Sequence, residues 1–471
     1  MAESAVIVGG GLAGIATALQ LADDGRVVTL IEGRPRLGGA AFSFQRGQLS
    51  IDNGQHVFLR CCSAYRTLLE RIGATDQVTL QDHLDIPVLR ADGVRARLGR
   101  VPGVPAPLHL TTALARYGLL SRTDRIRAVR GALALRRLNP TDLSLDGQSL
   151  GTFLRRHGQN DATIGALWGI VATATLNQRP DTASLMLAAK VFRTGLLDRA
   201  GAADVGFAHA PLGAVHSIAA MSALQDAGVE VLLRHRVDRV EPGGLVCAST
   251  RDGLRRWRAD AVVLAVPPAA ALAVAPALQD SRAAAVRGLG TTPIVNVHVV
   301  YDRQVTDLPF AAAVDSPVQW VFDRTESSGL RRTHRAGQYL AVTVSAADDI
   351  ITTPSRLLQQ QFVTELARLL PGAARANVLD TFVTREPRAT FAQTPGSAAM
   401  RPGPDPGLDR VWLAGAWTAT GWPDTMEGAV RSGVAAAQAV KPPIARRSTN
   451  GRPAALGNSR HSATHREGVR R

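Results

Sequence analysis

Residues 4–33, SAVIVGGGLAGIATALQLADDGRVVTLIEG, decide the fold of this chain. Residues 5–8 suit a buried strand, and after the glycines apolar side chains recur at helical spacing as far as Leu21. Gly25 ends the predicted helix, and residues 27–31 form a second apolar strand. Strand, glycine turn, helix and strand make one βαβ unit, which predicts an α/β fold with a Rossmann-like parallel sheet.

The turn after the first strand carries a G-x-G-x-x-G motif, formed by Gly9, Gly11 and Gly14. The first glycine permits the tight turn, the second lets the backbone approach a pyrophosphate, and the third lets helix and strand pack closely. The helix start at Leu12 and Ala13 offers free N–H groups to the phosphates. Glu32 ends the second strand, where a carboxylate accepts ribose hydroxyls. The pattern predicts a dinucleotide cofactor without choosing between FAD and NAD.

The length and composition indicate how many domains the chain can form and which classes of partner it can bind. The chain has 471 residues, enough for two domains with a sizeable core. Its formal charge is +15, yet only two of its 54 basic residues are lysine, a bias that indicates a GC-rich genome rather than a ligand. Aromatic residues make up 4% of the chain, too few for an obvious base-stacking surface. We therefore expect no nucleic-acid partner and rank a nucleic-acid binder last among the candidate functions.

The cellular compartment and the presence of a metal site can be predicted from the cysteines, the histidines and the apolar runs. Three cysteines, two of them adjacent at Cys61 and Cys62, build no disulfide framework, which indicates a reducing compartment. No basic leader precedes the first strand and no apolar run reaches eighteen residues, so we expect a cytoplasmic protein. The eleven histidines lack ligand spacing, and no metal site is predicted.

Residues 110–138, LTTALARYGLLSRTDRIRAVRGALALRRL, form a basic and amphipathic segment. Such a segment suits contact with anionic lipid, which would place the protein on the inner face of the membrane. The same pattern also fits the exposed, arginine-rich face of an ordinary domain helix. The residues alone leave both interpretations open.

Segments of the nucleotide-binding type recur in three separated pieces of the chain. A hairpin is expected over residues 42–52, helical segments over about 86–204, and strands with one helix over 288–394. The predicted dinucleotide-binding domain comprises residues 1–85, 205–287 and 395–440, and the substrate-binding domain comprises residues 86–204 and 288–394. Residues 441–471 are basic and without periodicity, which predicts a disordered tail.

A second glycine loop follows the predicted ribose carboxylate. Residues 33–44 read GRPRLGGAAFSF, and such a loop lets the backbone pass close to the middle of a long flavin dinucleotide. Here the chain resembles the amine oxidase and phytoene desaturase superfamily of flavoproteins, whose pattern is E-x-R-x-x-x-G-G-R. The matching residues are Glu32, Arg34, Gly38 and Gly39, whereas Ala40 replaces the last arginine. The resemblance implies FAD and a discontinuous FAD-binding domain with an inserted α+β substrate domain.

Two later stretches extend the resemblance. In RHRVDRVE, residues 234–241, the backbone of Val237 corresponds to the position that meets the adenine. In VWLAGAWTATGWPDTMEGAVRSG, residues 411–433, a helix N-terminus is expected to face the pyrimidine end of the flavin, where its dipole stabilises a reduced ring. Asp424 or Thr425 is expected to cap that helix. Further cofactor contacts are implied for Gly54, His56, Gly415, Thr425 and Met426.

Within the superfamily the chain looks most like the bacterial hydroxysqualene dehydroxylases. The stretches that carry this likeness are IDNGQHVFLRCCSAYRTLLERIG (51–73), LWGIVATATLN (167–177) and TGWPDTMEGAVRSG (420–433). The likeness implies loss of the hydroxyl of hydroxysqualene as water, with hydride from reduced flavin, to give squalene for hopanoids. It also implies a long apolar isoprenoid substrate and other squalene-pathway enzymes as partners.

Removal of a hydroxyl calls for an acid near the flavin. The candidates are Asp52, His56 and Asp424, each with an alternative role: turn former, flavin hydrogen-bonder and helix cap. An apolar cavity is expected from residues for which core packing is the alternative: Leu167, Trp168, Ile170, Val171, Leu185, Met186, Leu187 and Phe192. Two other functions stay open, a carotenoid-type desaturase on the same fold and a flavin-binding partner of squalene synthesis without turnover.

Overall fold

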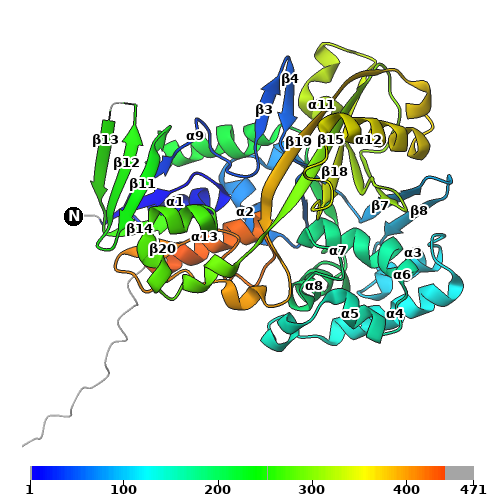
Figure 1. Ribbon diagram of the computed structural model, residues 1–471, viewed down its shortest axis with the longest axis horizontal. Coiled ribbons are helices and arrows are strands. Elements are labelled where there is room, and N and C mark those ends of the chain that lie inside the picture. Colours follow the sequence, from blue (N-terminus) through cyan, green and yellow to red (C-terminus); the bar gives the residue numbers. More distant parts are fainter. Residues whose placement is uncertain (1–2, 252, 441–471) are drawn as a thin grey trace, which may run out of the picture. The chain divides into compact units, whose positions relative to one another are not determined.

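Five parallel strands form a sheet of the order β10–β2–β1–β14–β20 in the computed structural model, which describes residues 3–251 and 253–440 (Figure 1). The strands are β1 (Ser4–Val8), β2 (Val27–Glu32), β10 (Glu230–Leu233), β14 (Ala261–Leu264) and β20 (Val411–Leu413). Helix α1 (Leu12–Asp23) connects β1 to β2, which confirms the predicted βαβ unit. The predicted tail, residues 441–471, lies outside the described residues.

Helix α13 (Met426–Val440) packs directly against α1. A methyl group on Gly433 would lie 2.3 Å from the carbonyl oxygen of Ala13, so only glycine allows the two helices to come this close. The hydroxyl of Thr17 donates to the Gly433 carbonyl at 3.1 Å. Helices α2 (Ser63–Arg71) and α9 (Ala219–Asp226) pack nearby, against α13 and α1. Helices α1 and α13, from opposite ends of the described chain, are therefore neighbours in space.

A seven-stranded sheet has the order β19–β15–β18–β17–β16–β7–β8 (Figure 1). Its strands are β7 (Asp85–Arg90), β8 (Arg95–Gly99), β15 (Thr291–Tyr301), β16 (Phe310–Val314), β17 (Trp320–Asp323), β18 (Gln338–Ser345) and β19 (Val378–Phe391). Helix α12 (Ser355–Leu369) packs against β15 and β19, close to the helix expected within residues 288–394.

The first two strands of that sheet correct the expectation of helical structure from residue 86. Strands β7 and β8 pair antiparallel around Asp92 and Gly93, where the backbone of Gly93 has a φ of +87°. An Asp-Gly pair is a strong hairpin signal, because its glycine readily adopts positive φ. The abundance of leucine and arginine around it outweighed this signal in the prediction.

Helices follow from residue 111: α3 (Thr111–Ala115), α4 (Arg122–Arg137), α5 (Leu150–Arg156), α6 (Asp161–Thr163), α7 (Gly169–Leu176) and α8 (Leu185–Phe192). The amphipathic segment 110–138 is two helices, because a loop at Tyr117 and Gly118 separates α3 from α4. Ser121 caps α4 by accepting the Asp124 amide at 3.1 Å. Across residues 3–251 and 253–440, none of the helices combines the length and apolarity needed to cross a bilayer.

Several shorter strands and α-helices lie between these elements. Hairpin β3 (Ser43–Arg46) and β4 (Leu49–Asp52) confirms the hairpin expected over residues 42–52. The other short elements are β5 (Val57–Leu59), β6 (Val78–Leu80), β9 (Val205–Ala208), β11 (Arg236–Glu241), β12 (Leu245–Thr250), β13 (Gly253–Arg258), α10 (Pro268–Val274) and α11 (Thr325–Ser328).

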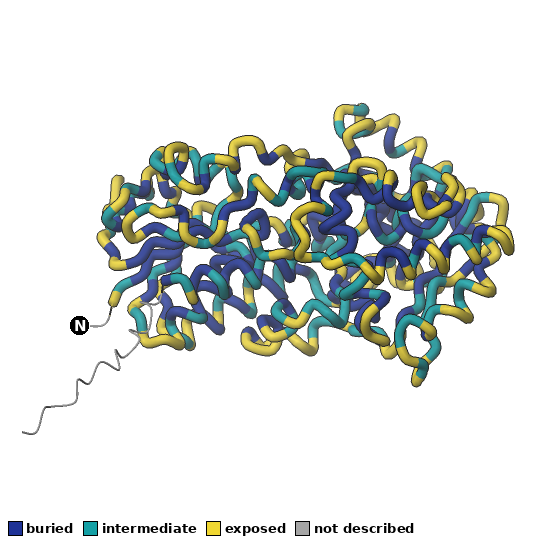
Figure 2. Tube along the Cα trace, turned by 90° about the horizontal axis from the view of Figure 1, so that it is seen from below, coloured by how far each residue is buried: buried dark blue, intermediate teal, exposed yellow. Residues whose placement is uncertain are grey.

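The predicted cavity residues are mostly buried. Figure 2 shows that buried segments, in dark blue, run mainly through the interior of the trace. Trp168 and Phe192 meet edge to face with ring centroids 5.3 Å apart, and the Trp168 indole donates to Gln159 at 3.0 Å. Leu167 and Val171 are only partly buried. Most of this set therefore stabilises the helices by packing, and these two remain the candidates for contact with a ligand.

Candidate cofactor site

The glycine turn lies at the carboxyl ends of β1 and β14. A methyl group on Gly14 would lie 1.9 Å from the carbonyl oxygen of Gly9, and one on Gly9 would lie 2.5 Å from that of Ala265. Both glycines are therefore required by the protein itself. A methyl group on Gly11 would instead meet nothing closer than the α-carbon of Gly39, at 3.7 Å. At Gly11 the protein itself would therefore tolerate a methyl group, in ordinary van der Waals contact with Gly39.

Helix α1 begins at this turn without a side-chain cap. Gly11 stands at its N-cap position and offers no side-chain hydrogen bond to the first amides. The N–H groups at Leu12 and Ala13 thus carry the positive end of the helix dipole without a capping side chain. An anionic group is the natural acceptor for such a helix start.

The second glycine loop packs directly on the first. The Gly38 amide donates to the Gly10 carbonyl at 2.9 Å, and a methyl group on Gly39 would lie 2.8 Å from the α-carbon of Gly11. The guanidinium of Arg36 lies 3.6 Å from the centroid of the Phe42 ring and donates to the Gly39 carbonyl at 3.2 Å. A cation thus stands at this loop although Ala40 replaces the arginine of the superfamily pattern.

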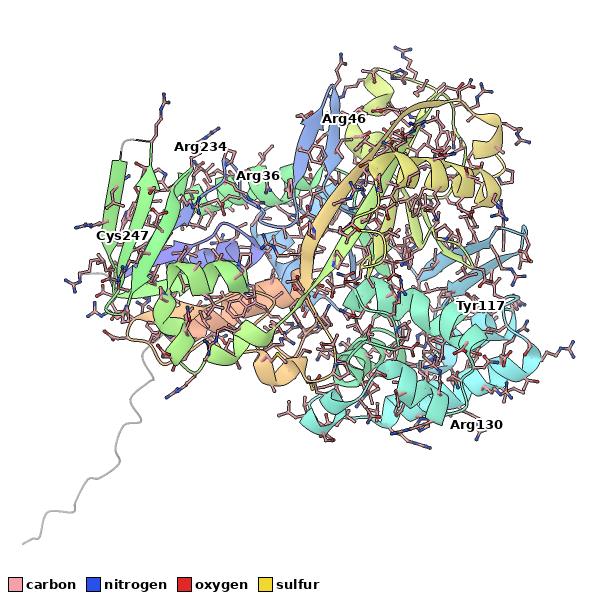
Figure 3. The ribbon with its side chains drawn as sticks, viewed as in Figure 1. Arg36, Arg46, Tyr117, Arg130, Arg234 and Cys247 are labelled. Carbon is pink, nitrogen blue, oxygen red and sulfur yellow. The ribbon has the colours of Figure 1, made fainter. Side chains whose placement is uncertain are left out.

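Glu32 stands beside both loops at the end of β2. Its carboxylate accepts the Gly10 amide and the Arg34 amide, each at 2.7 Å. The His235 amide donates to the Glu32 carbonyl at 3.0 Å, which brings β11 and the buried Val237 to the same edge. Figure 3 shows Arg36 and Arg234 at this edge, where β2 and β10 end. The structure therefore brings together the predicted phosphate, ribose and adenine residues.

The turn between β4 and β5 is held by a network centred on Asn53. Its amide nitrogen donates to the Ala40 carbonyl at 2.9 Å and to Glu386 at 3.0 Å, and its side-chain oxygen accepts the Phe42 amide. The Asn53 carbonyl accepts the amide of Asn296 from β15 at 3.0 Å. Sequence reasoning missed Asn53, Asn296 and Glu386, because only the fold brings these three segments together.

Gln55 and His56 follow in the same turn. The Nε2 group of Gln55 is buried without a hydrogen-bond partner among the described residues. His56 contacts the Gly54 carbonyl through Nδ1 at 3.1 Å, and burial lowers the pKa of its ring. A buried, unpaired amide donor is costly, so this position is suited to a ligand that brings an acceptor.

Asp52, a predicted acid, lies in a saturated network. Its carboxylate accepts the Ser43 hydroxyl at 2.6 Å, the Leu212 amide at 3.0 Å and the Arg324 guanidinium at 2.5 Å. Arg324 also donates to the Ala208 carbonyl at 2.8 Å. These contacts join the β3–β4 hairpin to the segment preceding α11.

Helix α13 begins next to the carboxyl end of β20. Thr425 is its cap, because the Thr425 hydroxyl accepts the Gly428 amide at 3.2 Å, and Met426 is its first residue. The Gly415 amide donates to the Ser432 hydroxyl at 2.8 Å, and the backbone of Gly415 has a φ of +142°. Of the two predicted caps, the structure selects Thr425.

Asp424 has different partners from those expected of a cap. Its carboxylate accepts the Phe391 amide at 2.8 Å, and its own amide donates to the side chain of Gln393 at 3.0 Å. Burial raises the pKa of the Asp424 carboxyl to about 6, and the Phe391 hydrogen bond and Arg401 oppose this rise. No hydrogen bond or ion pair joins Asp424 to Asp52 or His56 in residues 3–251 and 253–440.

Arg401 holds the loop that leads to Asp424. Its guanidinium is buried and donates to the backbone carbonyls of Ala416, Thr418 and Trp422 at 2.9, 2.6 and 2.8 Å. Burial lowers the pKa of Arg401 to about 10, and nearby Asp424 opposes that shift. Sequence reasoning missed this residue, since an isolated arginine in a proline-rich segment carries no local signal.

Glu427, in the first turn of α13, reaches another helix. Its buried carboxylate accepts the Tyr65 amide at 2.8 Å and the Ala64 amide at 3.2 Å, and so caps α2. Arg431 pairs with the same carboxylate at 2.6 Å. The Tyr65 hydroxyl in turn contacts His216, whose pKa is lowered to about 4 by burial. The helix start that faces the site is thus tied to α2.

These features fit an elongated dinucleotide. The uncapped helix start after Gly11, where the backbone carries no side chain, suits a diphosphate. Glu32 suits a ribose, and the unpaired donor of Gln55 suits a polar ring. Within residues 3–251 and 253–440, no group of three histidine, cysteine, aspartate or glutamate side chains is placed to hold a metal ion.

Comparisons with known proteins bear on this site. Residues 12–441 match the model of the family described as flavin containing amine oxidoreductase. Hydroxysqualene dehydroxylase of Rhodopseudomonas palustris is 30% identical over 93% of this chain and 99% of its own. The 15-cis-phytoene desaturase of Glycine max is 25% identical over 92% of this chain and 79% of its own. The structure of cyclohexylamine oxidase from Brevibacterium oxydans aligns over 93% of this chain and 99% of its own with a TM-score of 0.66 at 21% identity, which supports the fold.

Proposed function

The chain belongs to the flavin-containing amine oxidoreductase family, and from this premise we propose that it reduces hydroxysqualene to squalene. It is an FAD-dependent oxidoreductase. The observation that carries the choice of substrate is the near full-length similarity to the hydroxysqualene dehydroxylase of Rhodopseudomonas palustris. The reaction exchanges a hydroxyl for a hydrogen and releases water.

We assign FAD to the two glycine loops and to the start of α13. In this proposal the amides at Gly11, Leu12 and Ala13 bind the diphosphate, Glu32 binds the adenosine ribose, and Val237 lies at the adenine. Gly38 and Gly39 pass its middle, and Gly54, Gln55, His56, Gly415, Thr425 and Met426 surround the ring. When bound in its reduced form, FAD supplies the hydride.

Asp424 is the acid in this proposal. Its carboxyl has a pKa of about 6, so a useful fraction is protonated near neutral pH and can donate to a leaving hydroxyl. Protonation lets the C–O bond break with its electron pair leaving as water. The carbon then accepts the hydride and its electron pair, and solvent reprotonates the Asp424 carboxylate. The carboxylate left after proton transfer also stabilises positive charge on the reacting carbon.

The other two predicted acids suit other roles. Asp52 is engaged by Arg324, Ser43 and the Leu212 amide, so its carboxylate has little capacity left for substrate. The lowered pKa of His56 keeps its ring neutral at physiological pH, where it serves as a hydrogen-bonding group rather than a general acid. We therefore assign Asp52 to the fold and His56 to the cofactor.

The long apolar substrate requires apolar walls and a route from lipid. We assign residues 1–85, 205–287 and 395–440 to FAD binding and residues 86–204 and 288–394 to the substrate, with Leu167 and Val171 as partly buried candidates for its walls. A peripheral contact with the membrane is part of this proposal, since such a substrate resides in the bilayer.

The test is product formation by the purified protein. FAD-loaded enzyme is reduced with dithionite under argon and mixed with hydroxysqualene in detergent, and the organic extract is analysed by gas chromatography and mass spectrometry. Squalene, formed together with reappearance of the oxidised flavin absorbance, supports the proposal. Recovery of unchanged hydroxysqualene from fully reduced enzyme would overturn it.

A carotenoid-type desaturase is the second candidate, favoured by the similarity to the phytoene desaturase of Glycine max. A desaturase removes hydrogen from its substrate and therefore needs oxidised flavin and an electron acceptor. Incubation of oxidised enzyme with phytoene and a quinone separates the two functions. New conjugated absorbance there, without squalene in the first assay, would favour the desaturase.

A further inference from the structure

Helix α4 presents three large apolar side chains to solvent. Ile126, Val129 and Leu133 are 66%, 42% and 42% exposed. Their spacing of three and four residues places them in one stripe along the helix. Single exposed apolar residues are common on protein surfaces, but a continuous stripe on one helix face indicates contact with another apolar medium.

The stripe is not needed to anchor α4. The opposite face of the helix is buried through Ala128, Gly131, Ala134 and Leu135. A methyl group on Gly131 would lie 3.1 Å from the Trp168 ring, so the helix already packs closely against its neighbours. The outward side chains are therefore free to serve another purpose.

Arginines lie in line with the stripe and along one side of it, and the stripe contains no acidic residue. At 100° per residue, Arg122, Arg130 and Arg137 fall within roughly 70° of the centre of the stripe. All three are exposed, and none of them makes an ion pair within residues 3–251 and 253–440. Figure 3 shows Arg130 at the outer edge of the helical part.

The single acidic residue of α4 faces inward. Asp124 is buried. Its carboxylate accepts a hydrogen bond from the side-chain amide of Asn160 at 2.9 Å and pairs with Arg127 at 3.0 Å. Arg136 lies 4.0 Å from Asp198, and among the described residues this is the other ion pair of the helix. The unpaired guanidinium groups therefore lie at the N-terminal end of the apolar stripe and along one side of it.

We propose that the α4 face, defined as Arg122, Ile126, Val129, Arg130, Leu133 and Arg137, docks the protein on the anionic surface of a lipid bilayer. The apolar stripe enters the boundary between headgroups and acyl chains, and the guanidinium groups bind lipid phosphates. This inference deepens the proposed function, because it names the surface through which a bilayer-resident substrate is approached.

Charge complementarity selects a bilayer over the other occupants. A symmetric contact between two copies of this chain would place α4 arginines against α4 arginines, which is unfavourable. A nucleic acid would leave the apolar stripe against phosphates, and the face carries no aromatic side chain on which bases could stack. An anionic bilayer satisfies both the arginines and the stripe.

Flotation of the full-length, FAD-loaded protein tests the proposal. Vesicles of phosphatidylcholine alone are compared with vesicles that contain one third phosphatidylglycerol. The wild type is expected to float with the anionic vesicles and to dissociate from them as sodium chloride is raised, because salt screens the arginines. Absence of flotation with anionic vesicles at low salt would overturn the inference.

Three variants locate the contact. R122E/R130E/R137E is expected to lower partitioning by at least about fivefold for each arginine. I126S/V129S/L133S should lower it as well, while keeping the charge. The matched control is R255E/R256E/R258E on the exposed strand β13, which has the same charge change and should float like the wild type. All variants keep the basic residues 441–471, so any effect of that segment is common to them.

The controls separate the possible failures. Flavin absorbance and circular dichroism verify that each variant folds and binds cofactor. Flotation of the α4 variants like the wild type, or an equal loss in the β13 control, would overturn the assignment to α4. A concentration-dependent dimer that the serine variant abolishes, without flotation, would assign the face to a second copy and also overturn it.

The membrane contact and the reaction fail independently. With detergent-dissolved hydroxysqualene the α4 variants should match the wild type, and with substrate in anionic vesicles they should be slower. A wild type that floats but forms no squalene in detergent would contradict the proposed function and leave the docking surface intact.

Discussion

The carboxylate of Asp52 and the guanidinium of Arg324 meet at 2.5 Å, with side chains only 5% and 10% exposed. The pair spans 272 residues of sequence and joins the β3–β4 hairpin to the seven-stranded sheet. Removing one partner of a buried pair leaves the other charge desolvated without compensation.

Arg324→Met is therefore expected to lower the free energy of unfolding by about 3–5 kcal/mol, as measured by urea denaturation of the apoprotein. The double variant Asp52→Asn/Arg324→Met should recover part of this loss, because no buried charge is left unpaired. A loss below about 1 kcal/mol for the single variant would show that the pair is solvated.

Gly11 and Gly14 make a matched pair for separating cofactor binding from folding. Gly11→Ala has room in the protein and should leave the unfolding free energy of the apoprotein within about 0.5 kcal/mol of the wild type. Its FAD affinity should fall at least tenfold in fluorescence titration, since the methyl group occupies the proposed diphosphate position. Gly14→Ala should instead destabilise the apoprotein by several kcal/mol, because its methyl group meets the Gly9 carbonyl. If both variants changed the unfolding free energy of the apoprotein by the same amount, the assignment of Gly11 to cofactor binding and Gly14 to folding would be wrong.

Asp424→Asn is expected to lower kcat by about 10²–10⁴-fold, the usual contribution of a general acid, with FAD content unchanged. The asparagine oxygen can still accept the Phe391 amide, so the loop geometry is kept. Rapid-mixing assays of squalene formation give the rate. A variant with nearly normal kcat would contradict the assignment of Asp424 as the acid.

The pH dependence follows from the raised pKa of Asp424. Because the protonated carboxyl is the active form, kcat/KM should decline about tenfold per unit as pH rises above about 6. The Asn variant should lose this decline along with its rate. A flat profile in the wild type between pH 6 and 8 would exclude Asp424 as the donor.

The raised pKa of Asp424 should also make the free energy of unfolding depend on pH. The folded-state pKa lies above the ordinary value of 3.8, so the folded protein binds the proton more tightly than the unfolded chain. The stability contributed by this proton is present below pH 3.8 and lost as pH rises through about 6. Asp424→Asn should therefore gain stability relative to the wild type between pH 4 and 7 in urea titrations of the apoprotein.

Local patterns sufficed for the first βαβ unit, because Gly9, Gly14 and Glu32 act within one short stretch whose glycine spacing has few other uses. The same applies to the start of α13, although the choice of Thr425 over Asp424 as its cap required the structure. Spacing indicates which residues stand near a helix start, and it does not determine which side chain turns toward it.

Long-range partners lay beyond prediction. The carboxylate of Glu427 caps α2 by accepting the amide of Tyr65, which lies 362 residues away in the sequence. Gln55 was not predicted as a site residue. Its side-chain amide can be recognised as buried and unpaired only from the folded structure. The β7–β8 hairpin could have been found from Asp92 and Gly93, and in that case the local signal was present but underweighted.

The pairing of α1 with α13 has a consequence for biosynthesis. Strand β20 and α13 are translated about 400 residues after the glycine turn at Gly9, yet β20 completes the parallel sheet and α13 packs against α1. During synthesis, one edge of β14 and one face of α1 therefore stay uncovered until β20 and α13 have left the ribosome. In the proposed function, a chain that ends before β20 lacks Gly415, Thr425 and Met426. We therefore expect such a chain to bind FAD weakly and to be recognised by chaperones and proteases.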